Sequence, residues 1–278
     1  MTTSSPVRPR APRPCKPGMW AIRGTLPRRQ YWLFAVLGLL LPLGLWWVVS
    51  SGEAVNSVFL PGPVDVFNRL LNWYSEGDLL GDMGISIYRV TAGFLVSAVV
   101  ALPLALLIGT FRPVQAVLEP LTDFIRYMPA VAFIPLVMLW VGIEESSKIA
   151  IIIIGTFFQM VLMMAEDVRR GPMAQIEAAQ TMGEDKGETI GLVIFQSAKP
   201  ALLDTLRVTM GWAWTYLVVA ELVAANSGLG YSILKAQRFL QTDKIFVGII
   251  LIGVIGLVMD QLFRLAHRKA FPWMHIKS

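Results

Sequence analysis

Long apolar segments alternate with short polar ones along most of the chain. Runs of about 17 to 25 apolar residues are long enough for a helix to cross a hydrocarbon core of about 30 Å. Six segments have this character, and we predict spans near residues 31–50, 85–109, 125–143, 147–167, 201–224 and 245–265. The pattern therefore predicts an all-α integral membrane protein with six transmembrane helices.

The first apolar run has an alternative interpretation as a signal peptide, because a basic segment precedes it. The run is longer than a typical signal-peptide core, and the following "SSGEAVNS" is a poor cleavage site. We therefore favour an uncleaved first span. It would follow a basic, proline-rich tail over residues 1–30 and begin a transmembrane domain over residues 31–278.

Composition supports the membrane assignment. The chain is 55% hydrophobic and 15% charged, whereas soluble proteins carry about a quarter of charged residues. The net charge of +5 raises the question of nucleic acid, but basic loops beside membrane spans explain it better. We therefore expect membrane lipid and no nucleic acid as a partner. One cysteine and two histidines without ligand spacing predict no metal site.

The distribution of basic residues predicts the orientation. With the N-terminus inside, the six spans put 18 of the 24 Lys and Arg on the inner side. Positive charges concentrate on the cytoplasmic side of membrane proteins. We therefore expect both termini, and the polar loop over residues 168–200, to be cytoplasmic.

That loop contains "GPMAQIEAAQTMGEDKG" at residues 171–187. Pro172 and Gly183 are suited to the start and end of a short helix. Asp185 and Glu188 have the spacing of a capping box, which predicts a second helix running to Lys199. The result is a helical elbow with a small-residue face at Ala178 and Ala179, which would fit a groove on a partner, and with Glu177, which could bind a partner Arg or Lys. On the residues alone, a solvated loop with a helical turn explains the stretch equally well.

The stretch "EAAQTMG", with Glu177, Ala178, Ala179 and Gly183, resembles the EAA motif in membrane subunits of bacterial ABC importers. Further stretches resemble the branch that serves nitrate, sulfonate, taurine and bicarbonate; they are "SIYRVTAGF", "PAVAFIPLVMLWVGIEESSKI", "VVAELVAANSGLGYSI" and "RKAFPW". The resemblance covers roughly residues 60 to 273. It departs from the family pattern at Phe195 and Gln196, where Leu and Pro are expected, although Val193 holds the aliphatic place.

The resemblance implies a type I ABC importer permease fold with a cytoplasmic coupling-helix elbow. Glu177, Ala178, Ala179 and Gly183 would couple to an ATPase subunit. Two permease copies, two ATPase subunits and an external solute-binding protein would complete the importer in the bacterial inner membrane. ATP and Mg²⁺ would bind the ATPase, since this sequence has no GxxxxGK[ST] phosphate loop and needs no cofactor of its own.

Four residues are candidates for the pathway or for contact with an anion. An arginine within a span costs about 2.5 to 3.5 kcal/mol at the bilayer centre and often marks a solute path. For Arg89 we nevertheless favour snorkelling or an internal ion pair, and for Arg126 an anchor at the inner interface. Pro129 frees backbone carbonyl groups, which makes the third span the best candidate for pathway lining. Trp140 is suited either to the path or to packing.

Two further features of the outer side suggest structural roles. Glu221 would repel an anion, so an ion pair or helix cap is the favoured interpretation. The glycine-rich "NSGLG" at residues 226–230 predicts a turn on the outer face, where it could contact the binding protein.

Two other functions remain alternatives. A secondary transporter with its own ion coupling would require a chain of intramembrane carboxylates, of which the sequence offers little. A membrane-embedded enzyme would require a nucleophile and base or a metal cluster, and the sequence contains neither pattern. Nitrate, sulfonates, taurine, bicarbonate and aromatic carboxylates are all compatible solutes.

Overall fold

The structure is a computed structural model that describes residues 27–52 and 56–275, and it divides into two units after Asn56. The first unit contains helix α1 (Arg28–Ser51), which includes Pro42 and is long and apolar enough to cross a membrane. The predicted tail over residues 1–30 lies almost entirely outside the described residues.

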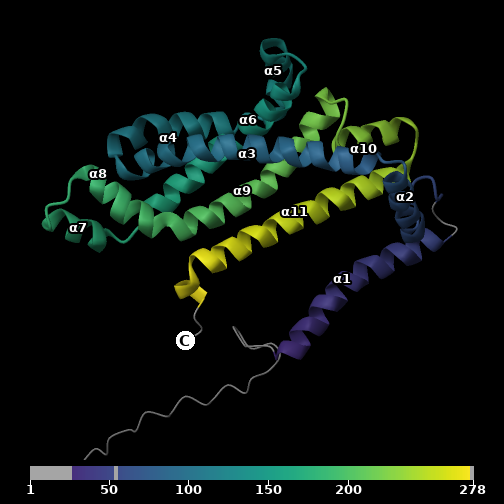
Figure 1. Ribbon diagram of the computed structural model, residues 1–278, viewed down its shortest axis with the longest axis horizontal. Coiled ribbons are helices and arrows are strands. Elements are labelled where there is room, and N and C mark those ends of the chain that lie inside the picture. The colour runs from purple at the N-terminus through teal and green to yellow at the C-terminus, as the bar shows by residue number, and fades with distance from the viewer. Residues whose placement is uncertain (1–26, 53–55, 276–278) are drawn as a thin grey trace, which may run out of the picture. The chain divides into compact units, whose positions relative to one another are not determined.

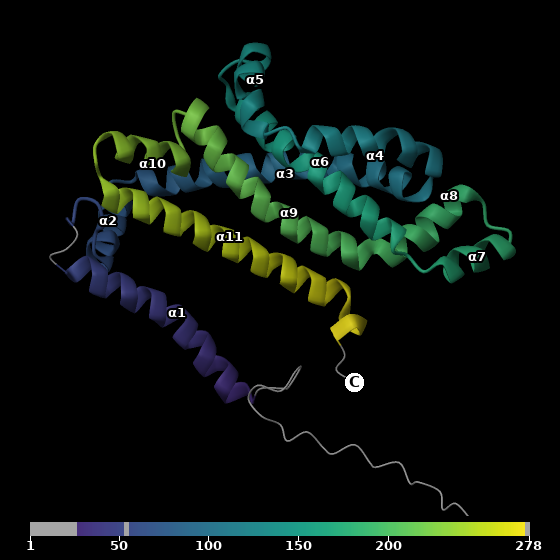
Figure 2. The same ribbon diagram turned by 180° about the vertical axis from the view of Figure 1, so that it is seen from behind.

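Among the described residues of the second unit, the regular secondary structure is helical, as the sequence predicts. Its helices are α2 (Pro63–Ser75), α3 (Asp78–Thr110), α4 (Arg112–Arg126), η1 (Ala130–Phe133), α5 (Ile134–Val141), α6 (Glu145–Arg169), α7 (Met173–Thr181), α8 (Lys186–Glu188), η2 (Thr189–Ile194), α9 (Phe195–Ala224), α10 (Leu229–Arg238), α11 (Thr242–Ala270) and η3 (Pro272–His275). The long helices α3, α6 and α9 pack side by side, and α11 packs along α9 (Figures 1 and 2).

Small residues at four-residue intervals explain why α3 packs closely on α6. The stripe consists of Gly93, Ser97, Ala101, Ala105 and Gly109. A Cβ atom at Gly93 would lie 2.8 Å from the side chain of Ile152, and one at Gly109 would lie 2.6 Å from that of Val168. Small side chains allow helix backbones in membranes to approach closely and gain van der Waals contact.

The predicted span over residues 125–143 is wrong as a single helix. Helix α4 ends at Arg126, and the segment from Ala130 to Val141 leaves it at an angle of 86°. Pro129 precedes η1 and disfavours helical backbone at the residue before it, which explains the break. Figure 1 shows α5 projecting away from the layer of long helices.

Among the described residues, four helices are long and apolar enough to cross a membrane, or five if the bent pair counts as one span. They are α1, α3, α6 and α11. Helix α9 has 30 residues and packs along α6, but it is not among them. Its four charged residues, which lower its hydropathy, are Lys199, Asp204, Arg207 and Glu221.

The two ends of the second unit carry different short helices. Helices α7 and α8 lie at one end, and α2 and α10 lie at the other (Figure 1). In the sequence, Val66, Leu70, Leu71 and Trp73 can share one apolar face of a helix over residues 64–74, which predicts a helix lying on the membrane surface. In the structure α2 packs against α11 and buries Val66 and Trp73, while Leu71 on the same predicted apolar face is half exposed.

The second helix of the elbow does not stop at Lys199. One turn of α8 widens into the π-helix η2, which continues directly into α9 with Pro200 inside it. The departures from the family pattern at Phe195 and Gln196 therefore lie where the widened turns give way to α9. The elbow and the following long helix form one continuous element.

Candidate functional site

The elbow at residues 171–194 is built largely as its sequence predicts. Helix α7 begins after Pro172, and Gly183 has a φ of +88°, in the left-handed region that favours glycine. The Glu184 N–H donates to the Ala179 carbonyl oxygen at 3.2 Å, and the Gly183 N–H donates to that of Gln180 at 3.1 Å. These bonds satisfy the last carbonyl groups of α7 and reverse the chain.

The predicted capping box that begins the second arm is confirmed. The Glu188 N–H donates to an Asp185 carboxylate oxygen at 2.7 Å, and the Asp185 N–H donates to the Glu188 carboxylate at 3.2 Å. The reciprocal pair satisfies two backbone donors at the start of α8. The turn between the arms is therefore fixed by hydrogen bonds on both sides.

The four motif residues differ in exposure. Glu177, Ala178 and Gly183 are exposed, whereas Ala179 is only 1% exposed. Ala178 and Ala179 thus do not share the exposed small-residue face that the sequence suggests. Met173 and Met182 are also exposed, so the outer surface of α7 combines one carboxylate with apolar and small side chains.

A cavity of about 610 Å³ lies inside the elbow. The ends of α3 and α6 line one side of it, and α7 and η2 line the other. Its charged lining residues are Arg112, Arg169, Glu184 and Lys186. Beside this space, α7 packs against η2, the other arm of the elbow, and buries Ala179.

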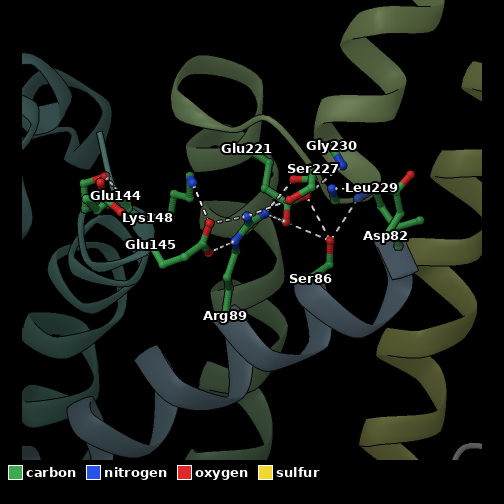
Figure 3. Close-up of polar contacts among 12 residues, drawn as sticks. Asp82, Ser86, Arg89, Glu144, Glu145, Lys148, Glu221, Ser227, Leu229 and Gly230 are labelled. Atoms are coloured by element: carbon green, nitrogen blue, oxygen red, sulfur yellow. Dashed lines mark hydrogen bonds and ion pairs between the residues drawn. The ribbon is translucent and has the colours of Figure 1, made fainter. Parts of the chain in front are cut away.

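At the opposite end of the unit, Arg89 is the centre of a buried polar network (Figure 3). Its side chain is fully buried, and all five of its N–H donors have acceptors. Nε and Nη2 donate to Glu145 at 2.6 and 2.8 Å, Nη1 donates to Glu221 at 2.7 Å, and Ser227 accepts from both Nη atoms. The favoured internal ion pair is present, and the guanidinium group is too deeply buried to snorkel to water.

Glu221 has the structural role that its sequence position suggests. It accepts hydrogen bonds from Arg89, from the Ser86 hydroxyl at 2.7 Å and from the Gly230 N–H at 2.7 Å. Gly230 lies in the first turn of α10, so this carboxylate is both an ion-pair partner and a helix cap. Figure 3 shows the carboxylate directed toward both groups.

The glycine-rich turn before α10 folds into the same network. The Gly228 N–H donates to Asp82 at 2.8 Å, and the Leu229 N–H donates to the Ser86 hydroxyl at 2.9 Å. Gly228 has a φ of +112°, and a Cβ atom there would lie 2.4 Å from the Glu221 carboxylate. This explains why the position requires glycine.

Glu145 is a partner that the sequence does not reveal. It lies in the first turn of α6, where its carboxylate accepts from Arg89 and, at 2.7 Å, from Lys148. A carboxylate at a helix start is read most simply as a favourable interaction with the helix dipole. Its pairing with Arg89, 56 residues away in sequence, depends on how α3 and α6 pack.

Arg126 has a different environment. At the end of α4, its Nε donates to Asp123 at 2.8 Å, Nη2 donates to the Tyr127 hydroxyl at 3.1 Å, and Nη1 makes a long 3.4 Å contact with Gln159. Its side chain is 31% exposed. Of the other predicted pathway residues, Pro129 lies at the bend beside it, and Trp140 is 72% exposed on α5.

Within the described ranges, no three His, Cys, Asp or Glu side chains gather into a group that could hold a metal ion. The polar side chains around Arg89 are hydrogen-bonded to one another, whereas at the elbow one buried carboxylate oxygen of Glu184 has no hydrogen-bond partner among the described residues. What this arrangement offers is an exposed elbow at one end, a closed charge network at the other and long apolar helices between them. These features define a multi-helix integral membrane protein with a projecting polar elbow.

The family assignment follows from sequence comparison. Residues 99–271 match the family described as binding-protein-dependent transport system inner membrane component, and the chain belongs to that family. A Brucella melitensis protein named "Probable ABC transporter permease protein BMEII0107" is 36% identical over 83% of this chain and 93% of its own length. The Escherichia coli taurine transport system permease protein TauC is 30% identical over 83% of this chain and 86% of its own length.

The fold comparison agrees. A chain of the MetNI methionine ABC transporter in an inward-facing conformation superposes with a TM-score of 0.59 at 20% identity. The match covers 69% of this chain and 97% of that one. At this identity the likeness concerns the fold, which is that of a type I ABC importer permease. The chain is thus an ABC transporter permease, a transport component with an inner-membrane family assignment.

Proposed function

We propose that this permease forms the translocation pathway of an ATP-driven importer for a small anion, and that the elbow couples it to the ATPase. Glu177, Ala178 and Gly183 would contact the ATPase subunit directly. Ala179 would act through its packing, because it is buried on the side of α7 that faces its own chain. The observation that carries this proposal is the elbow's exposed, rigidly closed turn at one end of the helical unit.

The construction of the elbow suits the transmission of force. Hydrogen bonds fix the turn at Gly183 and Asp185, and η2 joins the second arm to α9 without a break. A displacement of α7 would therefore be passed along a continuous helix of 30 residues. The cavity inside the elbow leaves room for such movement.

The remaining parts of the importer would lie on other chains. ATP and Mg²⁺ would bind the two ATPase subunits, a second permease copy would complete the pathway, and an external binding protein would deliver the solute. Both termini would be cytoplasmic, with the elbow on the same side, and lipid would surround the apolar helices. The concentration of basic residues on the predicted inner side supports this orientation.

A small anion is the favoured solute class. The family resemblance and the taurine permease relative both support sulfonates, with nitrate, bicarbonate and aromatic carboxylates as related candidates. Arg126, with donors still available in a partly exposed site, is the cation best suited to contact such a solute. Arg89 is not, since its five donors are already used.

The secondary-transporter alternative depended on a chain of intramembrane carboxylates. Glu221 is engaged by Arg89, Ser86 and Gly230, and Asp260 is paired with Arg207 and Arg264. Carboxylates held in this way are poorly suited to relaying protons. The geometry therefore favours energy supplied by a partner chain.

A pull-down from native membranes tests the coupling proposal. The tagged chain is purified in mild detergent as wild type and as Glu177→Lys, and co-purifying proteins are identified by mass spectrometry. Charge reversal should deplete the ATPase subunit at least tenfold, because a charge-assisted hydrogen bond would be replaced by repulsion between like charges.

The matched control is Glu76→Lys, which makes the same charge change at the far end of the unit. It should leave the ATPase bound. Equal recovery of the ATPase with Glu177→Lys and wild type would contradict the role of the elbow. Absence of any ATP-binding protein with wild type, under conditions that preserve other complexes, would contradict the importer assembly.

A further inference from the structure

A second cavity lies beside the bend between α4 and α5, far from the elbow. Its volume is about 240 Å³. It opens against the middle of α6, between Ile154 and Gln159. At about 1.5 Å per residue, these positions lie about 14 Å from either end of α6, which places the cavity near the middle of the bilayer.

Most residues that line this cavity have apolar side chains, but more of its surface is polar than apolar, and one lining side chain is a cation. Its side chains are contributed by η1, α6, α9 and the end of α4; the principal ones are Arg126, Phe133, Phe158, Gln159, Trp212 and Tyr216. Among the described residues that line it, Arg126 is the single charged side chain. An anion in this space would meet one positive group and no carboxylate within the lining.

Arg126 has capacity for a ligand. Of its five N–H donors, three contact acceptors in the part of the chain that the structure describes, and the contact with Gln159 is long at 3.4 Å. Arginine can offer two parallel N–H groups to the oxygens of an acid group. Arginines within membranes usually face water-filled cavities and mark solute paths.

The aromatic part of the lining is held close by a glycine. Tyr216 packs directly on α6 at Gly155, where a Cβ atom would lie 2.3 Å from its ring. Phe158 stacks edge-to-face with Phe157, with ring centroids 5.1 Å apart. The rings of Tyr216 and Phe158 thus lie in the same lining as the one cation, an arrangement suited to a ligand with an acid group and an apolar body.

We propose that this cavity is a halfway binding site for an organic anion, a sulfonate or carboxylate with a short apolar body. This rests on the proposed import function. Arg126 and Gln159 bind the acid group, and the rings of Phe133, Phe158 and Trp212 contact the body. The volume equals that of roughly eight water molecules, which is too large for close contact with nitrate alone.

Asp123 gives the site a built-in release mechanism. Its carboxylate lies 2.8 Å from Arg126 Nε, and it lines an adjoining cavity of about 300 Å³ that Arg126 also borders. Asp123 therefore competes with the bound acid group for the same guanidinium. Its competition weakens binding, as a transport site requires if the solute is to leave.

Equilibrium binding to the purified permease, together with its co-purifying subunits, tests this site. The probe is radiolabelled propane-1-sulfonate, with unlabelled butanoate and nitrate as competitors. Wild type should bind propane-1-sulfonate, butanoate should compete, and nitrate should compete at least tenfold less well. The ATPase content of each preparation is measured in the same samples, so that the importer assembly is assessed independently.

Two substitutions should change affinity in opposite directions. Arg126→Gln should weaken binding at least tenfold, whereas Asp123→Asn should strengthen it about two- to fivefold. The control Arg264→Gln removes an arginine whose Nε pairs with Asp260 at 2.8 Å, outside this lining, and should leave affinity unchanged. Trp212→Ala should weaken propane-1-sulfonate binding and leave nitrate competition unaffected.

Three results would overturn the inference while leaving the proposed function intact. One is absence of probe binding although the ATPase co-purifies. A second is binding that both Arg126→Gln and Trp212→Ala leave unchanged, which would place the probe elsewhere. A third is nitrate competing as well as butanoate, which would remove the apolar body from recognition.

Discussion

Arg89 and Arg126 are both arginines in apolar surroundings, but their environments are opposite. Arg89 is fully buried and donates to two carboxylates and a serine from three other segments of the chain. Arg126 is 31% exposed, has one carboxylate three residues away in its own helix, and borders two cavities. One arginine joins parts of the fold, whereas the other retains donors for something outside it.

The comparison shows that an intramembrane charge does not by itself define a function. The cost of desolvation must be offset, either by partners within the protein or by water and ligand in a cavity. The number of donors left without a protein acceptor distinguishes the two cases. Counting these donors distinguishes an arginine that stabilises the fold from one that contacts solute. Four substitutions test this criterion.

The largest effect should come from Arg89→Gln. Removing one partner of a buried ion pair leaves carboxylates uncompensated and costs about 3–5 kcal/mol. The free energy of unfolding can be measured by titration with SDS in mixed micelles. Arg264→Gln, which removes an exposed arginine with one carboxylate partner, should cost less than about 1 kcal/mol.

A double substitution separates charge from packing. Arg89→Met with Glu221→Gln removes both charges of the buried pair, so it should recover a substantial part of the stability that Arg89→Gln loses. If the free energy of unfolding of Arg89→Gln is nearly that of wild type, the network contributes little to stability. The contrast with Arg126 then disappears.

Gly228→Ala should have the next largest effect on the same region. The substituted residue would have to adopt a φ of +112°, with its Cβ atom 2.4 Å from Glu221. Such backbone strain costs about 1–3 kcal/mol. Gly253→Ala is the control, because nothing lies within 4 Å of a Cβ atom at this helical glycine. An unfolding free energy for Gly228→Ala equal to that of the control would exclude the proposed crowding.

Much of this contrast could not be read from the sequence. Local signals predicted the elbow well, since Pro172, Gly183, Asp185 and Glu188 act within a few residues of one another. Glu145 could not be assigned to Arg89, because the pairing depends on how α3 and α6 pack. The stripe of small residues from Gly93 to Gly109 was the available signal for that packing.

The bend after α4 was missed for a related reason. Because the sequence is apolar from Tyr127 onward, it does not show that a helix ends at Arg126. Helix α4 itself is amphipathic. Gln159 was a usable signal, as one of two polar side chains within the apolar run of α6, but its significance requires Arg126 and Trp212, which line the same cavity. Cavities form between elements, so residue patterns within one element do not reveal them.

Gly155→Ala should affect stability and the Arg126 cavity together. A Cβ atom there would lie 2.3 to 2.6 Å from the ring of Tyr216, so the ring or the two helices must move. Overpacking of this kind costs about 1–3 kcal/mol. The unfolding titration should show this loss, and propane-1-sulfonate binding should weaken. Loss of stability with unchanged binding would mean that the Tyr216 ring does not shape the site.

Arg126→Gln should have the smallest effect on stability and a large one on solute binding, which is the sharpest form of the comparison. Its ion pair with Asp123 is partly exposed, and such pairs contribute about 0.2–1 kcal/mol. The unfolding free energy of Arg126→Gln should therefore resemble that of Arg264→Gln, although only Arg126→Gln weakens anion binding. A loss of several kcal/mol would instead make Arg126 a second structural arginine. Its free donors would then belong to contacts with another chain, and the criterion drawn from Arg89 would no longer distinguish a solute site from a helix interface.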